Sequence, residues 1–395
     1  MNRRVRLAVV GGQRGASFGA VLERLSDRVE LTAVCDLSQD VLTGWKAKYP
    51  EIQTFSSYEQ LLEHPLVDAV LLATPMLIHA SQAIQALQAG KHVLSEVIAS
   101  HTIEDSWKLI EAVKASGLTY MMAENYGYTR ENMMIQNMVN AGVFGEITYA
   151  ECGYIHDVRN LLHDESGRLT WRGHYIRDYN GSTYPTHSLG PVAQWLGINR
   201  EGGDAFDELV TFTSNSRSAS QYFAEHFGQA HPCAQPGGMN QGDTSTTLIR
   251  TKNGVLISLR VDLLSSRPHN MVHYGLQGTR GAYLAPRFEG EDPLLWLEQD
   301  EEDGPHSHSG WNSLWKYKEQ WDHPMWKQWS EQALRSGHGG GDFYVMEEFV
   351  SSILENRKPA VDVYDAVTWS SVFPLSVQSV ATGGAPVKFV NFLSG

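Results

Sequence analysis

The feature that most constrains the fold of this chain is a short apolar run that a glycine-rich turn follows at once. Arg4–Val10 predicts a buried strand, and GGQRGASFG leads from it into a helical pattern that ends near Leu25. A strand, a glycine-rich turn and a helix in this order let the backbone approach a pyrophosphate above a helix N-terminus. Gly12 and Gly15 fill the last two glycine positions of that fingerprint, whereas Val10 stands at the first. The match is incomplete and depends on the next elements.

The second predicted strand supports the fingerprint. The run ELTAVCD ends at Asp36, about twenty residues past the glycines, which is the spacing of dinucleotide-binding folds. An acidic side chain there accepts hydrogen bonds from the adenosine ribose and repels a 2′-phosphate. The pair of elements therefore predicts NAD, in preference to NADP, as the cofactor.

Strands and helices alternate through the rest of the N-terminal third. The predicted strands are 67–73, 91–95 and 118–122, and the predicted helices are 58–62, 79–87 and 107–115. This alternation predicts a doubly wound parallel sheet, in which ligands bind at the carboxyl ends of the strands. We place an NAD-binding Rossmann domain at residues 1–125.

The pattern changes in the remainder of the chain, residues 126–395. An apolar-faced helix at 132–139 precedes alternating runs separated by glycine turns: ITYAECGYI, ELVTFTS, STTLIRT, GVLISLRVDL and MVHYGLQGT. Such runs predict an antiparallel sheet. Helices are expected from Asp342 and over 365–380, the latter interrupted by Pro374 and able to pack back on the first domain, before a short strand VKFVNF. The predicted fold class is α/β, a Rossmann domain plus a second α/β domain with an open, mostly antiparallel sheet.

Composition excludes several classes of protein. The 395 residues carry a net charge of −14, which disfavours a nucleic-acid or anionic-membrane partner. Three widely spaced cysteines indicate neither a disulfide framework nor a thiolate metal site. The basic N-terminus is followed by only a short apolar run, and no window approaches the length of a membrane span, so we expect a cytoplasmic protein. The acidic run within 289–303 is interpreted as a solvated loop, and no metal site is predicted.

A constrained turn, NGSTYPTHSLGP at 180–191, carries a tyrosine and a histidine three residues apart. Pro185 disfavours helical backbone at Tyr184 and holds it extended. The sequence after His187 predicts a short helix that ends near Gly197. A histidine just before a helix, on a rigid backbone, can be directed at a ligand, although most histidines in such a turn are structural.

The block ATPMLIHASQAIQALQAGKHVLSEV resembles the shared block of the Gfo/Idh/MocA superfamily, which pairs a Rossmann domain with an open-sheet domain. In ordinary dehydrogenases of that superfamily this block ends in Glu-Lys-Pro, and the lysine lies at the reacting hydroxyl. Here the triplet is Glu96-Val97-Ile98. The absent lysine argues against a plain sugar dehydrogenase.

A more specific set of motifs resembles glycoside hydrolase family 109. It comprises GYIHD at 153–157, Trp171-Arg172, YPTH at 184–187, GPVAQ at 190–194 and GHGGGDF near the C-terminus. Two departures stand out: His269 follows Arg-Pro where the family has tyrosine, and residues 199–204 contain an insertion. His269 falls at a position that the family uses for its substrate, so the resemblance constrains the mechanism more than the sugar.

The resemblance implies a redox mechanism in place of two flanking carboxylates. NAD takes hydride from C3 of the sugar, a base removes the C2 hydrogen, the aglycone leaves C1, water adds and the hydride returns. His187 and Tyr184 are the expected catalytic pair, and which of them serves C3 or C2 stays open. Histidine titrates near neutrality, whereas tyrosine does so only beside a cation. The expected substrate contacts are Tyr154, Arg172, Pro185, Thr186 and His269.

The same resemblance implies the residues around NAD and the partners. The expected cofactor contacts are Gly12, Gln13, Arg14, Gly15, Asp36, Thr74, Met76, Leu77, Ile78, His79, Glu96, Val97 and Asn125. The substrate is expected to be a small-molecule glycoside, and a homodimer or homotetramer is expected by analogy with the superfamily.

Two other functions fit the sequence. One is a sugar or cyclitol dehydrogenase that releases NADH, with a histidine base in place of the missing lysine. The other is a non-catalytic NAD-binding sensor or scaffold. The elimination mechanism also tolerates other glycosides, since the sequence leaves the sugar, the anomer and the aglycone open.

Overall fold

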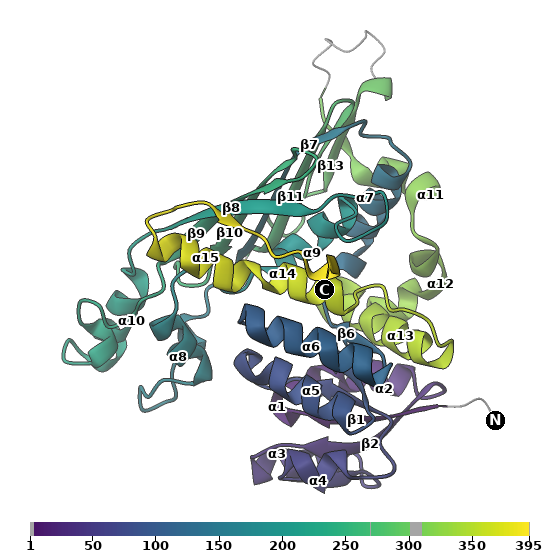
Figure 1. Ribbon diagram of the computed structural model, residues 1–395, viewed down its shortest axis with the longest axis vertical. Coiled ribbons are helices and arrows are strands. Elements are labelled where there is room, and N and C mark those ends of the chain that lie inside the picture. Colours follow the sequence, from purple (N-terminus) through teal and green to yellow (C-terminus); the bar gives the residue numbers. More distant parts are fainter. Residues whose placement is uncertain (1–3, 269, 301–309, 395) are drawn as a thin grey trace. The chain divides into compact units, whose positions relative to one another are not determined.

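A computed structural model describes residues 4–268, 270–300 and 310–394 (Figure 1). The chain forms two compact units, and neither is one continuous segment. The first unit combines Met1–Arg130, Pro324–Ser370 and Phe392–Gly395. The second combines Glu131–His323 and Ser371–Asn391.

The first unit is built on a sheet of six parallel strands in the order β3-β2-β1-β4-β5-β6. The central strands are almost entirely buried, as their continuous apolar runs require. The predicted doubly wound parallel sheet is therefore confirmed. The strands are β1 Val5–Val10, β2 Val29–Cys35, β3 Gln53–Phe55, β4 Ala69–Leu72, β5 His92–Ser95 and β6 Tyr120–Met122.

Helices connect these strands, and their ends follow the capping rules. Ser38 accepts a hydrogen bond from the backbone of Val41 at the start of α3, and Gly117 ends α6 in the left-handed conformation. Three further helices come from the C-terminal part of the chain. The helices of this unit are α1 Gly12–Gly15, α2 Gly19–Arg24, α3 Gln39–Lys48, α4 Tyr58–Leu62, α5 His79–Gln88, α6 Ile103–Ser116, α12 Pro324–Ala333, α13 Gly341–Leu354 and α14 Val363–Ser370.

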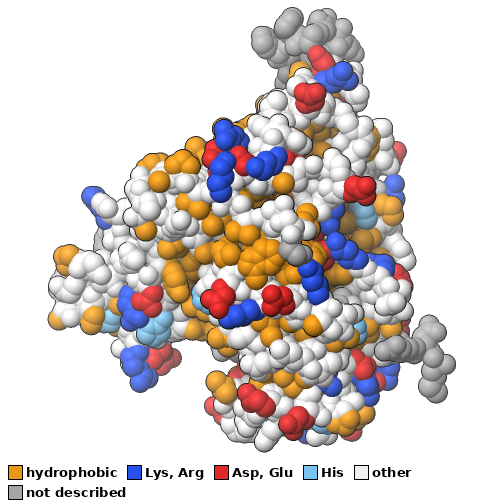
Figure 2. Space-filling view, viewed as in Figure 1, with side chains coloured by type: hydrophobic (Ala, Val, Ile, Leu, Met, Phe, Trp, Pro, Cys, Tyr) orange, Lys and Arg blue, Asp and Glu red, His pale blue; other side chains and the backbone are white. Residues whose placement is uncertain are grey.

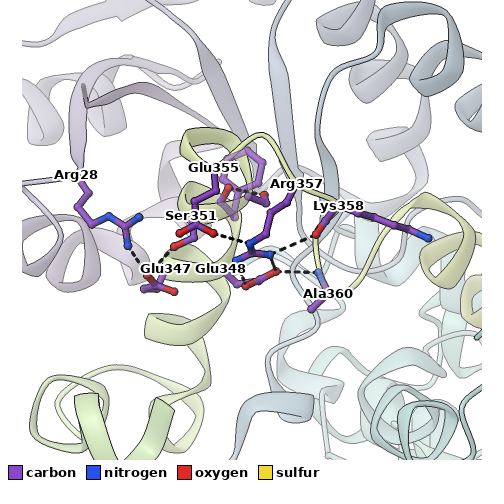
Figure 3. Close-up of polar contacts among 10 residues, drawn as sticks. Arg28, Glu347, Glu348, Ser351, Glu355, Arg357, Lys358 and Ala360 are labelled. Carbon is purple, nitrogen blue, oxygen red and sulfur yellow. Dashed lines mark hydrogen bonds and ion pairs between the residues drawn. The ribbon is translucent and has the colours of Figure 1, made fainter. Parts of the chain in front are cut away.

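Helix α13 is buried along nearly its whole length, although it carries two adjacent glutamates (Figure 3). Glu347 forms an ion pair with Arg28. Glu348 accepts two guanidinium hydrogen bonds from Arg357, at 2.6 and 2.7 Å, and one from the backbone N–H of Ala360 at 2.9 Å. Buried carboxylates persist when they are paired and hydrogen-bonded in this way. These contacts hold α13 to Arg28, the residue before β2, and to the chain that follows the helix.

The second unit contains a nine-stranded sheet in the order β14-β13-β12-β11-β7-β10-β9-β8-β15. Neighbouring strands are antiparallel except β7 and β10, which pair in parallel. The predicted open, mostly antiparallel sheet is therefore confirmed, and the alternating runs gave no sign of the one parallel pair, because alternation does not reveal which strand becomes the neighbour. The strands are β7 Ile147–Ile155, β8 Phe206–Thr213, β9 Thr244–Thr251, β10 Leu256–Asp262, β11 Asn270–Gly278, β12 Gly281–Leu284, β13 Leu294–Leu297, β14 Asn312–Ser313 and β15 Val387–Lys388.

Helices of the second unit cover one face of this sheet. Helix α9 packs on β7 and β11, and α15 packs on β8. The predicted break near Pro374 lies between α14 and α15, so that the proline occupies the first turn of α15, where its missing N–H is not needed. The helices are α7 Arg130–Asn140, α8 Trp171–Asp178, α9 Thr186–Trp195, α10 Ser218–Phe227, α11 Lys318–Trp321 and α15 Val372–Ala381.

Charged side chains of both signs are interspersed on the face of the molecule in view (Figure 2). Asp207 and Glu208 on β8 form ion pairs with Arg250, Lys252 and Lys388. Among the described residues, no helix combines the length and the apolar character needed to cross a bilayer. Within the same residues, no three His, Cys, Asp or Glu side chains are grouped as metal ligands.

Candidate active site

The residues predicted to contact NAD follow the carboxyl ends of five parallel strands in the first unit. Because the strands are parallel, these ends meet at one edge of the sheet. Gly12, Gln13, Arg14 and Gly15 form α1 after β1, Asp36 follows β2, Thr74, Met76, Leu77, Ile78 and His79 follow β4, Glu96 and Val97 follow β5, and Asn125 follows β6. The structure therefore brings the predicted cofactor contacts to the edge where α/β folds bind ligands.

The turn after β1 explains the incomplete glycine fingerprint. Gly11, rather than residue 10, adopts positive φ (87°), and a Cβ there would lie 2.5 Å from the carbonyl oxygen of Ala73. A Cβ on Gly15 would lie 2.2 Å from Cγ1 of Val9. Glycines are thus required for the tight turn and for packing α1 against β1. The missing first glycine is replaced by its neighbour.

Asp36 is held at the end of β2 by two backbone groups. Its Oδ2 accepts a hydrogen bond from the N–H of Gln13 at 3.3 Å, and its Oδ1 accepts one from the N–H of Ser38 at 2.9 Å. These bonds orient the carboxylate beside the glycine turn. An anchored negative charge at this position suits ribose hydroxyls and disfavours a phosphate group.

His79 is buried at the start of α5, and both of its ring nitrogens lie near carbonyl oxygens. Nδ1 is 3.0 Å from the oxygen of Ile98, and Nε2 is 2.8 Å from the oxygen of Thr74. Burial lowers the pKa of His79, against the opposing effect of these carbonyls. The imidazole therefore ties together the loops that follow β4 and β5, and we expect it to influence a cofactor through the shape of these loops.

Arg14 and Glu96 form an ion pair at the same edge. The guanidinium Nε and Nη2 lie 2.9 and 2.7 Å from Oε1 of Glu96, whose side chain is only 9% exposed. A carboxylate buried to this degree needs such a partner. The end of β5 thus carries the carboxylate of Glu96, which is paired with Arg14 of α1. The lysine that follows this glutamate in the ordinary dehydrogenases is absent.

A histidine that the sequence analysis did not select lies near this pair. Nδ1 of His338 is 3.0 Å from both carboxylate oxygens of Asp342, and Oδ1 of Asp342 accepts a hydrogen bond from Nδ2 of Asn125 at 2.8 Å. Burial lowers the pKa of His338, but the hydrogen bond and the charge of Asp342 outweigh it and raise the pKa above its ordinary value. The charges of Arg14 and Glu96 also act on this imidazole, in opposite directions. His338 is therefore an imidazole that a buried carboxylate orients and whose charged form that carboxylate favours.

The glycines of the GHGGG block allow His338 to take its place. His338, Gly339 and Gly340 all have positive φ, at 52°, 62° and 99°. A Cβ on Gly337 would lie 2.3 Å from Oδ2 of Asp342, and a Cβ on Gly340 would lie 2.8 Å from the Trp326 ring. A histidine in the left-handed region is an outlier of the kind found at functional sites. The sequence signal was present, since a histidine among glycines preceded an aspartate by four residues.

The residues of the first unit fit a dinucleotide. The carboxylate of Asp36 and the close-packed glycine turn provide the ribose and pyrophosphate elements of a Rossmann site. Asn125 Oδ1 is buried, and the residues that the structure describes offer it no hydrogen-bond partner. A buried acceptor of this kind is normally satisfied, and a polar ligand at this edge could satisfy it.

In the second unit, three predicted residues form one cluster of rings. Tyr154 on β7, Tyr184 in the loop and His187 in the first turn of α9 have ring centroids 5.2 to 5.5 Å apart. The hydroxyl of Tyr184 lies 3.5 Å from Nε2 of His187, at the long end of the hydrogen-bonding range. Long contacts of this type commonly shorten when substrate binds. The structure thus brings together the two expected catalytic residues and one expected substrate contact.

The loop that carries this pair is fixed by a network of buried hydroxyl groups. The N–H of Ser182 donates to Oγ of Ser376 at 2.9 Å. Oγ of Ser182 lies 2.9 Å from Oγ of Ser245 and 2.8 Å from Oγ1 of Thr247. Nε2 of Gln241 donates to the carbonyl of the preceding Gly181 at 2.8 Å. The backbone therefore enters α9, at Pro185 and Thr186, in one defined direction.

Arg172 lies on a different element, α8, whose start is capped by Thr170. Its guanidinium carbon stands 4.6 Å from the ring centroid of Trp171, a cation–π contact. Burial raises the pKa of Tyr175, and the nearby charge of Arg172 opposes this rise. His269, the remaining predicted substrate contact, lies outside the described residues.

Comparison with known proteins identifies the family. Residues 128–395 match the model of the glycosyl hydrolase 109 C-terminal domain. The chain belongs to glycosyl hydrolase family 109. Residues 5–124 match the oxidoreductase family with an NAD-binding Rossmann fold, so this family 109 member is an NAD-dependent enzyme.

Curated relatives of the family 109 chain match over its whole length. A glycosyl hydrolase family 109 protein of Solibacter usitatus is 37% identical over 410 residues, covering 100% of this chain and 89% of the relative. A protein of Shewanella oneidensis named alpha-N-acetylgalactosaminidase is 34% identical over 403 residues, covering 99% and 85%.

Solved structures share the fold at lower identity. A levoglucosan dehydrogenase in complex with NADH has a TM-score of 0.79 at 18% identity, covering 99% of this chain and all of the other. The WlbA dehydrogenase of Bordetella pertussis, in complex with NADH and UDP-GlcNAcA, has a TM-score of 0.70 at 16% identity, covering 99% of each chain. At these identities the likeness shows the shared fold.

Proposed function

We propose that this enzyme hydrolyses α-N-acetylgalactosaminides, or a closely related glycoside, by transient oxidation of the sugar at C3. The observation that carries the proposal is the Tyr184–His187 pair, with 3.5 Å between the hydroxyl and Nε2, in a cluster of rings. These groups can move protons but cannot form the two flanking carboxylates of an ordinary glycosidase. The name of the Shewanella oneidensis relative supports the choice of sugar.

The proposed reaction uses the pair for two proton removals. One member takes the proton of the C3 hydroxyl while hydride leaves C3, which converts C3 to a ketone. The ketone acidifies the C2–H bond, and the other member removes that proton. The electron pair forms the C1–C2 double bond and breaks the bond from C1 to the aglycone oxygen. Which member serves C3 and which serves C2 is part of what the experiment must determine.

The aglycone oxygen must then receive a proton, and we assign this role to His338. Its Nδ1 is held by Asp342, so exchange falls to Nε2, as in other histidines oriented by a carboxylate. The raised pKa of His338 favours the protonated imidazole, the form that a general acid needs. In the second half of the reaction the same imidazole removes a proton from the water that adds to C1, while C2 regains its proton. The sum is glycoside plus water to free sugar plus alcohol.

Bound NAD would store the C3 hydride. When the hydride returns to C3 in the last step, the group that took the proton of the C3 hydroxyl gives it back to the C3 oxygen. The groups that would hold it are Asp36 and the turn at Gly11–Gly15, with Asn125 and the Arg14–Glu96 pair at the same sheet edge. Arg172 and Tyr154 would bind the sugar, the guanidinium also balancing the developing oxygen charge at C3. The predicted homodimer or homotetramer stays a prediction.

The test uses purified protein with no added NAD and a panel of 4-nitrophenyl glycosides in heavy water. We expect release of nitrophenol from the α-N-acetylgalactosaminide, no accumulation of NADH absorbance, and deuterium at C2 of the product sugar. A product without deuterium at C2 would rule out the elimination. In a parallel assay with NAD added, steady NADH formation without nitrophenol would instead establish the alternative function, a sugar dehydrogenase.

Variants separate catalysis from cofactor binding. His187→Gln and Tyr184→Phe are each expected to lower kcat by about 10²- to 10⁴-fold, the range of general acid–base catalysis. NAD affinity, measured by calorimetry, should stay close to that of the parent protein, since the Rossmann residues are untouched. A His187→Gln protein with full activity would contradict the proposed role. A parent protein that turns over no glycoside would instead favour the sensor or scaffold function.

A further inference from the structure

The carbonyl group of His187 has an unusual environment for a residue in a helix. In an α-helix this oxygen accepts a hydrogen bond from the N–H four residues later. Four residues after His187 stands Pro191, which lies inside α9 and has no N–H. The hydroxyl of Tyr274, on β11, donates to this oxygen at 2.6 Å. A side chain from the sheet thus replaces the helical donor.

Proline also explains why the carbonyl is accessible to the sheet. A proline ring inside a helix collides with the carbonyl four residues earlier and tilts it away from the helix axis. Helix α9 packs on β11, so the tilted carbonyl of His187 can meet Tyr274. Pro191, which lacks the N–H, and Tyr274, which supplies a hydroxyl, therefore both act on the carbonyl oxygen of His187.

Packing fixes the position of the Tyr274 hydroxyl. Tyr274 is only 4% exposed, and its ring stands edge-on to Trp195, with 5.7 Å between the centroids. The indole Nε1 of Trp195 in turn donates to the carbonyl of Asn132 at 3.0 Å. A hydroxyl held this firmly imposes its direction on the group that it binds. A chain of contacts thus links Asn132 on α7 to Trp195, Trp195 to Tyr274, and Tyr274 to the carbonyl of His187.

We propose that Tyr274 is a positioning residue for His187, acting through the hydrogen bond that Pro191 makes necessary. The inference rests on the proposed function, in which the His187 imidazole moves a proton. The tilt of the first turn of α9 sets where this imidazole stands relative to Tyr184. Displacement of a reacting group by about 1 Å can cost about 100-fold in rate, so a small rotation of the turn is enough to matter.

The decisive experiment combines Tyr274→Phe with Pro191→Ala in the NAD-loaded protein. Tyr274→Phe removes only the hydroxyl, and we expect kcat on the nitrophenyl substrate to fall by about 10- to 100-fold with KM nearly unchanged. Pro191→Ala restores a backbone N–H four residues after His187. In the double variant we expect kcat to recover to within about threefold of Pro191→Ala alone, a non-additivity typical of residues that share one partner.

Tyr283→Phe is the matched control. Tyr283 is fully buried on the neighbouring strand β12 and packs on the same Trp195, with 5.9 Å between the ring centroids. Like Tyr274→Phe, this variant loses a phenolic oxygen from a buried ring that packs on Trp195. We expect it to keep the parent kcat, whatever its effect on the melting temperature. Equal loss of kcat in both phenylalanine variants would mean that general packing, and not the bond to His187, is responsible, and would overturn the proposal.

A second readout does not depend on turnover. In protein labelled with ¹⁵N-histidine, the imidazole resonances of His187, assigned by their loss in His187→Gln, should shift in Tyr274→Phe and return toward the parent positions in the double variant. Unchanged resonances in Tyr274→Phe would overturn the proposal. If the parent protein cleaves no glycoside, the proposed function fails, while these resonances still decide whether Tyr274 positions His187.

Discussion

Nδ1 of His338 lies 3.0 Å from each carboxylate oxygen of Asp342, so one buried carboxylate holds one imidazole. The pKa values of the two groups shift in opposite directions. Burial lowers the pKa of His338, but Asp342 raises it by more, and the net pKa is raised. Burial likewise raises the pKa of Asp342, while His338 and Asn125 lower it by more. Each partner stabilises the charged form of the other near neutral pH.

Asp342→Asn should therefore move the alkaline limb of the kcat–pH profile to lower pH. As a general acid, His338 is active below its pKa, and the neutral amide removes the interactions that raise that pKa. Burial then dominates and lowers it. The asparagine oxygen can still accept from Nδ2 of Asn125, so NAD affinity serves as the control for an intact site. An alkaline limb that stays in place would show that His338 is not the group that titrates.

Asp36→Asn should weaken the binding of NAD and reduce the preference of the protein for NAD over NADP. The amide oxygen can accept from only one of the two backbone N–H groups, those of Gln13 and Ser38, and the charge that ribose hydroxyls prefer is lost. Loss of a charge-assisted hydrogen bond corresponds to about 1.5–3 kcal/mol, or about 10- to 100-fold in Kd. Calorimetric titration with both cofactors measures the change. Asp40→Asn, an exposed position in the first turn of α3, is the control and should leave both affinities unaltered.

The sequence alone was sufficient to predict the parallel sheet of the first unit, because strand, glycine turn, helix and Asp36 are local patterns. The cluster of Tyr154, Tyr184 and His187 required the family resemblance, since β7 and the loop are joined only by folding. Direct pairing of β7 with β10 was not predictable from alternation, which is the same for either direction of a neighbouring strand.

The environment of His338 is a clearer example of what sequence patterns cannot predict. Its function follows from Asp342, which is also bound by Asn125 from 217 residues earlier in the chain. Neither the spacing nor the composition of GHGGGDF says that this histidine meets a strand-end asparagine. The bond between Tyr274 and His187 spans 87 residues and is invisible for the same reason. Contacts of this kind arise from topology, which sets the distances between elements, and not from local propensity.

The two glutamates that share Arg357 should differ strongly in their contribution to stability. Glu348 is 7% exposed and also accepts from the N–H of Ala360, whereas the side chain of Glu355 is 57% exposed. Glu355→Gln is expected to change the free energy of unfolding by at most about 1 kcal/mol, as for surface pairs. Glu348→Gln weakens a buried pair whose arginine is 40% exposed, so we expect about 2 kcal/mol, below the range for fully buried pairs. Urea unfolding of both variants measures the difference, and equal effects would contradict the role assigned to burial.

Thr247→Val should both destabilise the protein and loosen the loop that carries Tyr184. Oγ1 of Thr247 lies 2.8 Å from the hydroxyls of both Ser182 and Thr211, and all three side chains are buried. Valine has nearly the same shape, so the change removes hydrogen bonds without opening a cavity, at a cost of about 1–3 kcal/mol for the groups left behind. Ser182 keeps its contact with Ser245 at 2.9 Å, which limits the loss.

Thr246→Val provides the comparison for this variant. Thr246 is the preceding residue of β9 and is exposed on the opposite face of the sheet, so valine there should change the free energy of unfolding by less than about 0.5 kcal/mol. Thermal unfolding should show the difference, and kcat should fall only in Thr247→Val, because Ser182 lies two residues before Tyr184. If the two valine variants behave alike, the hydroxyl network does not control the loop. If Thr247→Val is destabilised but retains the parent kcat, the network holds the fold without setting the geometry of the Tyr184–His187 pair.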